Sequence, residues 1–230
     1  MIKPWLAGGA VLLAAWTAIA PVAAQSEEAA RVRDSTTVLG EIMGADDKGV
    51  PRSIMEDAVG IAVFPGLIKA GFIIGGQRGR GVLSVQDEKS GTWSAPAFLT
   101  ITGGSLGAQI GAQAVDLVLI IMNRRGLEQL IANQFKIGAD ASAAAGPVGR
   151  DASAATDIQL RAQILSYSRT RGLFAGVTVN GSTLRQDRDA NERFYGQPYR
   201  TRQIVLERLG GAPEPVADWR DALVKYAGGS

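Results

Sequence analysis

The sequence predicts an α+β domain, in which an antiparallel sheet or partly closed barrel packs against an N-terminal helix and C-terminal helices. Three observations predict it. Residues 26–43 place apolar side chains at the three-to-four-residue spacing of a helix, and residues 201–226 return to that spacing. Between them, residues 59–102 form short apolar or alternating runs separated by glycine and proline, which is typical of strands.

Residues 1–24 are predicted to be an export signal. Lys3 supplies the positive start, residues 6–19 the apolar stretch, and Val22-Ala23-Ala24 a small-residue cleavage site. The mature chain should therefore begin near Gln25 and work in the periplasm, peripheral to a membrane if it binds one. No cysteine follows the cleavage site, so a lipid-anchored lipoprotein is excluded and the fold must form without disulfides.

The first elements of the domain follow in order. The helix over residues 26–43 has Val32, Leu39 and Ile42 on one face and two glutamates in its first turn, where they suit the helix dipole. Pro51 favours the start of a short helix that ends near residue 58. Strands are then predicted over residues 59–64, 70–74, 81–86 and 92–102, with a hairpin loop over 87–91.

The segment over residues 103–122 decides between three kinds of protein. Glycines at 103, 107 and 111 have the spacing with which membrane-spanning helices approach each other, and large aliphatic residues follow. Against a membrane span, Asp116 would place a carboxylate inside the bilayer at a cost of about 2.5–3.5 kcal/mol. The preceding residues 93–102 also alternate with the period of a strand. A buried structural segment of a binding domain is therefore the favoured interpretation.

A serine hydrolase is the third possibility, because residues 103–107 match the G-x-S-x-G turn that exposes a nucleophile, here Ser105. The chain contains no histidine, so the usual catalytic triad cannot form. No serine precedes a lysine by three residues, so the serine–lysine pair is missing too. We therefore do not expect an enzyme. Asp116 is expected to be a buried structural acid, satisfied by backbone amides or by an arginine.

In the second half of the chain, apolar residues again occur at the spacings of helices and strands. In order, the predicted elements are a strand or helix over 115–122, a helix over 124–133, strands over 162–167 and 172–179, and helices over 201–209 and 216–226. Trp219 and Leu223 belong to the apolar stripe of the last helix. The chain thus divides into the signal peptide, a main domain over 25–200 and a C-terminal helical extension over 201–230.

Charge and composition exclude several classes of function. The chain has 24 basic and 22 acidic residues, so no global field attracts nucleic acid. Without histidine or cysteine, zinc, haem and iron–sulfur sites of ordinary ligation are ruled out, and no metal or other cofactor is expected. Local charge is less even, because Lys69, Arg78 and Arg80 occur within a stretch that has no acidic residue.

Several blocks of sequence occur together in a recognisable order. They are GIAVFPGLIKAGFIIGGQRGRGVL (60–83), WSAPAFL (93–99), GGSLGAQIGAQAVDLVLIIM (103–122), AAGPVGR (144–150), GLFAGVTVNGS (172–182) and FYG (194–196). This succession resembles the SYLF domain family over residues 39–196. The resemblance implies a lipid-binding domain, of a kind found in eukaryotes beside SH3 or FYVE modules and in bacteria as an exported single domain.

Part of what the resemblance implies is not expected to apply. Eukaryotic relatives are associated with phosphoinositide membranes and, in fungi, with actin. This sequence shows no SH3 or FYVE pattern, and its export signal would separate it from cytoplasmic partners, so actin is not expected as a partner. Lipid binding is the property that we expect to be shared.

Glycines surround the basic cluster, so backbone amides and the cations Lys69, Arg78 and Arg80 could converge on one anionic lipid headgroup. The alternative is a strand pair with solvated arginines at its turn. The glycines could also line an acyl cavity or allow close packing. Those expected to have a structural role are Gly75, Gly76, Gly79, Gly103, Gly107 and Gly111.

The sequence therefore predicts a non-enzymatic protein of the cell envelope that binds lipid or a membrane surface, with anionic phospholipid as the expected ligand. Nucleic acid is not an expected partner. The alternative is a scaffolding protein that binds an envelope protein through its C-terminal region, residues 186–230, without binding lipid specifically.

Overall fold

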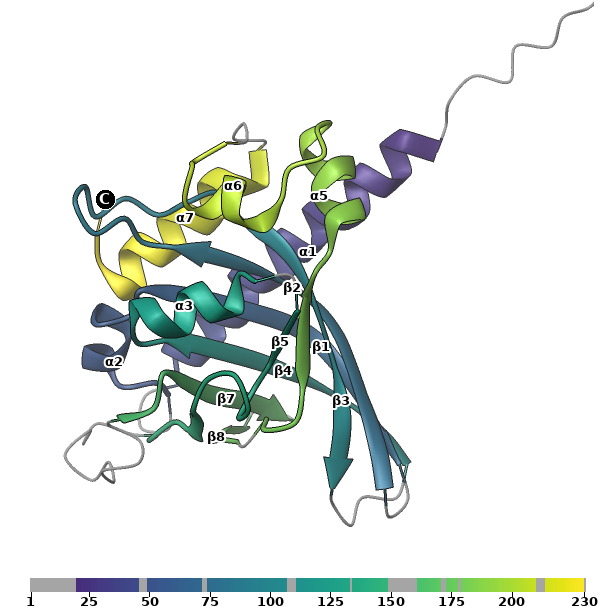
Figure 1. The fold of residues 1–230 in the computed structure, drawn as a ribbon, viewed down its shortest axis with the longest axis vertical. Coiled ribbons are helices and arrows are strands. Elements are labelled where there is room, and N and C mark those ends of the chain that lie inside the picture. Colours follow the sequence, from purple (N-terminus) through teal and green to yellow (C-terminus); the bar gives the residue numbers. More distant parts are fainter. Residues whose placement is uncertain are drawn as a thin grey trace, which may run out of the picture.

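The structure is a computed structural model, and it describes residues 20–45, 49–71, 74–106, 111–132, 134–148, 161–170, 173–177, 179–209 and 214–229. These residues form a curled sheet with helices on both sides of it, in the shape of a half-barrel (Figure 1). The α+β class predicted from the sequence, with an N-terminal helix and C-terminal helices on an antiparallel sheet, is confirmed.

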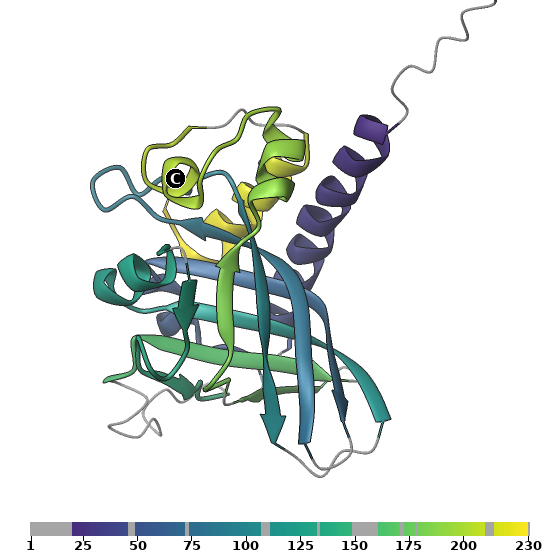
Figure 2. The ribbon, with the colours of Figure 1, turned by 45° about the vertical axis from the view of Figure 1, so that its right-hand side comes forward.

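The strands that the described residues form are paired in the order β5-β9-β3-β2-β1-β4-β7-β6, and β8 also pairs with β7. All pairs are antiparallel except β6 with β7. Their bounds are β1 Gly60–Gly71, β2 Ile74–Val85, β3 Ala97–Leu106, β4 Gly111–Ile121, β5 Gln134–Lys136, β6 Ala143–Ala145, β7 Ile164–Thr170, β8 Leu173–Gly176 and β9 Thr183–Gln186. The four longest strands, β1 to β4, extend at one end beyond the rest of the sheet (Figure 2).

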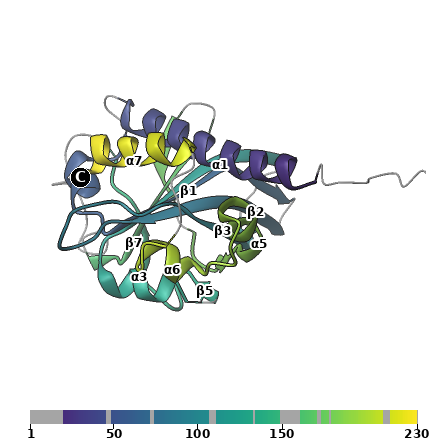
Figure 3. The ribbon, with the colours of Figure 1, turned by 90° about the horizontal axis from the view of Figure 1, so that it is seen from above.

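Two long helices lie side by side on the outer face of this sheet (Figure 3). They are α1, Ala20–Met43, and α7, Glu214–Ala227. The shorter helices are α2 Arg52–Glu56, α3 Arg124–Leu130, α5 Arg188–Tyr195 and α6 Thr201–Val205. The predicted signal peptide falls largely on residues 1–19, which lie outside the described residues, and α1 begins at Ala20, before the predicted cleavage site.

Alternation along the long strands assigns each side chain to one face of the sheet. On β2, Val82 and Ser84 face outward, where Trp219 of α7 donates a hydrogen bond from Nε1 to Ser84 Oγ at 2.8 Å. Inward-facing residues such as Phe64 and Leu117 are buried within the curl of the sheet. The core therefore extends to both sides of the sheet, and α1 and α7 complete it on the outer side.

A β-bulge interrupts β1 at Pro65 and Gly66. The pairing with β2 shifts by one residue between Val63 and Ile68, and the pairing with β4 shifts over the same stretch. Gly66 has φ 57°, a left-handed conformation that glycine adopts without a Cβ penalty. The glycine and proline that punctuate the sequence here therefore mark a bulge within one strand, and the prediction of two separate strands over 59–64 and 70–74 is wrong.

The segment 103–122 forms the end of β3 and all of β4, with residues 107–110 outside the described part. β3 continues through Ser105 to Leu106, so the described residues do not show the sharp turn that a serine nucleophile needs. The residues that were ambiguous between strand and helix, 115–122, are strand. Among the helices in the described ranges, none is both long enough and apolar enough to cross a membrane.

Candidate anion-binding groove

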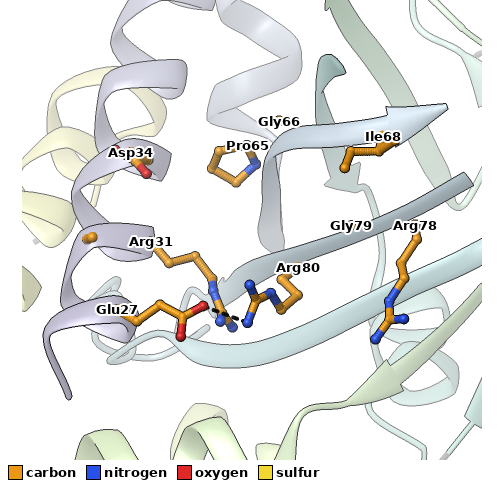
Figure 4. A pocket seen from close by; sticks show the side chains of 10 residues that line it. Glu27, Arg31, Asp34, Pro65, Gly66, Ile68, Arg78, Gly79 and Arg80 are labelled. Carbon is orange, nitrogen blue, oxygen red and sulfur yellow. Dashed lines mark ion pairs between the residues drawn. The ribbon is translucent and has the colours of Figure 1, made fainter. Parts of the chain in front are cut away.

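An open groove of about 740 Å³ lies between α1 and the strands β1 and β2 (Figure 4). It is bordered on one side by helix residues and on the other by the β1 bulge and the outer face of β2. The charged and apolar side chains that line it are Glu27, Arg31 and Asp34 from α1, Pro65 and Ile68 from β1, and Arg78 and Arg80 from β2.

Arg31 is the most deeply placed cation of the groove, with 7% of its side chain exposed. Its Nη1 lies 3.3 Å from Asp187 Oδ2, and its guanidinium stacks 5.2 Å from the centre of the Phe98 ring. Burial lowers the pKa of Arg31, and the positive charge of Arg80 lowers it further, although Asp187 opposes both effects. Arg31 Nη2 also lies 3.9 Å from Glu28 Oε1, so Arg31 lies beneath the groove as a cation whose charge is largely offset by two carboxylates.

Arg80 and Arg78 are the exposed cations of the groove. Arg80 Nη1 lies 2.7 Å from Glu27 Oε1, and both side chains are about half exposed, at 52% and 54%. An exposed pair of this kind contributes about 0–1 kcal/mol, so an incoming anion can compete with Glu27. Arg78 has no carboxylate at ion-pair distance among the described residues. Figure 4 shows the side chains of Arg31 and Arg80 meeting beside Glu27.

The structure does not bring Lys69 to this groove. Lys69 is paired in register with Gln77, whereas Arg78 is paired with Ile68. Directly paired residues share a face of the sheet, so Lys69 lies on the inner face with Gln77, and Arg78 and Arg80 lie on the outer face. Burial lowers the pKa of Lys69. Of the three cations expected to converge on one headgroup, only Arg78 and Arg80 therefore lie at the groove, and Arg31 of α1 lies there with them.

The glycines predicted to be structural differ in what surrounds them. A Cβ at Gly79 would lie 3.1 Å from the Leu67 side chain, and one at Gly103 would lie 2.8 Å from the Ser182 backbone. A Cβ at Gly76 would meet its nearest atom only at 3.9 Å. Gly75 is paired with Ser105 and Gly71 with Gly111, near the ends of the four long strands, while Gly107 lies outside the described residues. Close packing therefore requires glycine at Gly103, leaves little room for a Cβ at Gly79, and leaves ample room for one at Gly76.

Asp116 lies opposite the β1 bulge and not at the groove. Its Oδ1 accepts a hydrogen bond from the Gly66 N–H at 2.9 Å, and its Oδ2 accepts one from Arg169 Nε at 3.0 Å. Arg169 also pairs with Glu41 of α1. The Asp116 side chain is 17% exposed, so it is mostly buried. These contacts link β1, β4, β7 and α1, and each of them is structural.

We expect Asp116→Ala to lower the free energy of unfolding by about 1–3 kcal/mol, because the Gly66 amide loses its acceptor and Arg169 loses one of its carboxylate partners. Asp116→Asn should have a smaller effect, since an amide oxygen can still accept from Gly66. Urea unfolding of the three proteins measures the difference. If Asp116→Ala unfolds at the same urea concentration as the parent, the carboxylate has no structural role.

Sequence reasoning missed Arg31 as a member of the groove. Glu27 and Arg31 are four residues apart, so they lie on the same face of α1 one turn apart. That spacing was a usable signal. The spacing does not show that this face of α1 lies over the outer face of β2. That contact joins residues about fifty positions apart in the sequence.

The fold and the groove describe a helix-backed, curled sheet with two exposed arginines on an open groove. Comparisons with known proteins give its family. Residues 102–226 match the model of the Ysc84 family, described as "Las17-binding protein actin regulator". The chain belongs to this family, which is the SYLF domain family that its sequence resembles.

Several relatives are similar over most of this chain. LAS seventeen-binding protein 3 of Saccharomyces cerevisiae is 33% identical over 197 residues, which cover 84% of this chain and 42% of the yeast protein. SH3 domain-containing YSC84-like protein 1 of Homo sapiens is 32% identical over 192 residues, covering 83% of this chain and 54% of the human protein. This chain thus spans about half the length of these relatives or less. The name of the yeast relative describes a binding protein.

Proposed function

We propose that this chain is a non-enzymatic lipid-binding protein of the cell envelope, and that its groove contacts the headgroups of anionic phospholipids at a membrane surface. The observation that supports this most directly is the position of Arg31, Arg78 and Arg80 along one open groove between α1 and β2. Guanidinium groups form strong, often bidentate hydrogen bonds with phosphate oxygens, so this groove suits a phosphate group.

An exposed apolar side chain beside the arginines favours a membrane over a free phosphate. Ile68 lines the same groove and is 56% exposed, and no other large apolar residue that the structure describes is as exposed. At a bilayer surface, cations contact headgroup phosphates while neighbouring apolar side chains enter the boundary with the acyl chains. Ile68 and Arg78 are cross-strand partners, so both could reach the membrane together.

Export to the periplasm is part of this proposal and rests on the N-terminal sequence pattern. A protein partner in the envelope is the second candidate. The names of the relatives favour it, because the yeast relative is called a Las17-binding protein. Neither Las17 nor actin is proposed as a partner of this chain, since the predicted export signal would place it in a different compartment.

The test is binding of the purified domain to vesicles of phosphatidylcholine with and without phosphatidylglycerol, measured by co-sedimentation. Arg78→Gln/Arg80→Gln should lower the affinity for the anionic vesicles by about 10- to 30-fold, because each cation near such a surface contributes about 1 kcal/mol. Binding to phosphatidylcholine alone should change little. Added salt should weaken the parent more than the variant, because salt screens exposed charges.

Lys69→Gln is the matched control, since it removes one positive charge from the opposite face of the same strand pair. It should bind anionic vesicles nearly as well as the parent. A parent protein that does not distinguish the two kinds of vesicle would contradict the proposed function. In that case, recovery of a specific envelope protein with the purified parent would support the second candidate.

A further inference from the structure

The register of the sheet places a row of side chains beyond the groove on the same outer face. Arg78 of β2 is paired with Thr102 of β3, Thr102 with Thr183 of β9, and Thr183 with Lys136 of β5. Directly paired residues share a face, so these four side chains lie on one side of the sheet and cross four strands. The row has a cation at each end and hydroxyl groups between them.

A second row lies next to the first, two residues further along each strand. Arg80 is paired with Thr100, Thr100 with Arg185 of β9, and Arg185 with Gln134 of β5. Side chains two residues apart on a strand share a face, so both rows point the same way. Figure 2 shows β9 beside β3 at the edge of the long strands, where these rows lie.

Burial confirms which way the two rows point. The row between them consists of Gly79, Ile101, Leu184 and Phe135, and all four are buried. The four cations of the outer rows are exposed. We call this set, Arg78, Arg80, Lys136 and Arg185, the cationic face.

Little negative charge opposes the cationic face. Arg80 is paired with Glu27, and Asp140 accepts a hydrogen bond from the backbone N–H of Lys136. In the part of the chain that the structure describes, neither Lys136 nor Arg185 has a carboxylate at ion-pair distance. Four cations with one exposed ion pair among them produce a positive potential over the outer side of these four strands.

We infer that the cationic face docks the domain on several anionic headgroups of one bilayer at once, so that the groove is one end of a wider membrane-binding surface. This inference rests on the proposed function. Neighbouring strands are about 4.8 Å apart, so three strand steps separate Arg78 from Lys136 by roughly 14 Å, which is too far for one phosphate group to contact both. A surface with many phosphates matches this spread, and the threonine hydroxyls between the cations can donate to headgroup oxygens.

The test uses Lys136→Gln/Arg185→Gln in the full chain, because these two cations lie outside the groove. Its affinity for vesicles of phosphatidylcholine with phosphatidylglycerol should fall about tenfold relative to the parent. The dependence of binding on salt should become weaker as well. Soluble glycerol phosphate, which offers a single phosphate, should compete poorly for the vesicle-binding surface of both proteins. Arg52→Gln/Lys225→Gln removes the same charge from α2 and α7, away from the cationic face, and should bind like the parent.

The possible outcomes separate this inference from the proposed function. If the parent ignores anionic vesicles, the proposed function fails and the inference fails with it. If Arg78→Gln/Arg80→Gln weakens binding while Lys136→Gln/Arg185→Gln equals the parent, the groove binds lipid alone and the inference is overturned. The inference is also overturned if Lys136→Gln/Arg185→Gln binds heparin more weakly than the parent but binds the anionic vesicles equally well. Thermal melting of every variant is the check that it is folded.

Discussion

Replacing Trp219 with alanine is expected to lower the free energy of unfolding by about 3–5 kcal/mol, the range typical of a buried aromatic residue that is truncated. Trp219 is fully buried, at 0% exposure, where α7 packs on the outer face of the sheet. The substitution leaves a cavity there, and it also removes the indole N–H that donates to Ser84 Oγ. Urea unfolding followed by circular dichroism measures the change, since tryptophan fluorescence itself is altered by the substitution.

Two further variants separate packing from hydrogen bonding at this site. Trp219→Phe keeps most of the ring but leaves Ser84 without its donor, so it should cost less than alanine, about 1–3 kcal/mol. Asp218→Ala changes the neighbouring exposed residue and should cost less than about 0.5 kcal/mol. If Trp219→Ala and Asp218→Ala unfold at the same urea concentration, α7 is not part of the cooperative core.

Gly81→Ala should be the most damaging single-methyl change on β2. Its Cβ would lie 2.2 Å from the Val63 carbonyl oxygen and 2.5 Å from the Phe64 ring, and a backbone carbonyl in the centre of a sheet cannot move aside easily. Overpacking of this kind costs about 1–3 kcal/mol and occasionally more. Thermal and urea unfolding should both show the loss.

Gly76→Ala is the matched control, because it adds the same methyl group to the same strand where the nearest heavy atom is 3.9 Å away. There the added Cβ should be neutral or slightly stabilising, since alanine loses less backbone entropy on folding than glycine. Equal stability of the two variants would show that the sheet relaxes around Gly81, and the expected steric cost would then be wrong.

The sequence was sufficient to predict the α+β class because both periodicities extend over many residues. It also indicated a structural role for Asp116, since a lone carboxylate in an apolar run needs partners. It could not identify Arg169 as one of them, because 53 residues separate the two and only the pairing of β4 with β7 brings them together. Long-range pairings of this kind have no local signal.

The positions of the cations could likewise be predicted from the sequence only in part. Arg78 and Arg80 are two residues apart on one strand, so their common face follows from alternation alone. Lys136 and Arg185 join them only through the pairing of β3 with β9 and of β9 with β5. Lys69 is close to Arg78 in sequence, yet its face depends on the hairpin register, and glycine-rich strands specify register weakly.

The bulge at Pro65 and Gly66 determines which side chains of β1 face outward and which face inward after it. Val63 faces outward, so uninterrupted alternation would turn Leu67 and Lys69 outward and Ile68 inward. The extra residue inverts this: Leu67 and Lys69 face inward, and Ile68 emerges beside Arg78. Asp116 stabilises the bulge that causes this inversion, because its carboxylate accepts a hydrogen bond from the Gly66 amide. One inserted residue thus determines whether Ile68 or Lys69 lies on the outer face in the second half of β1. Deleting a single residue at the bulge would therefore move the lysine to the outer face and the isoleucine to the inner face, with almost no change in the composition of the strand.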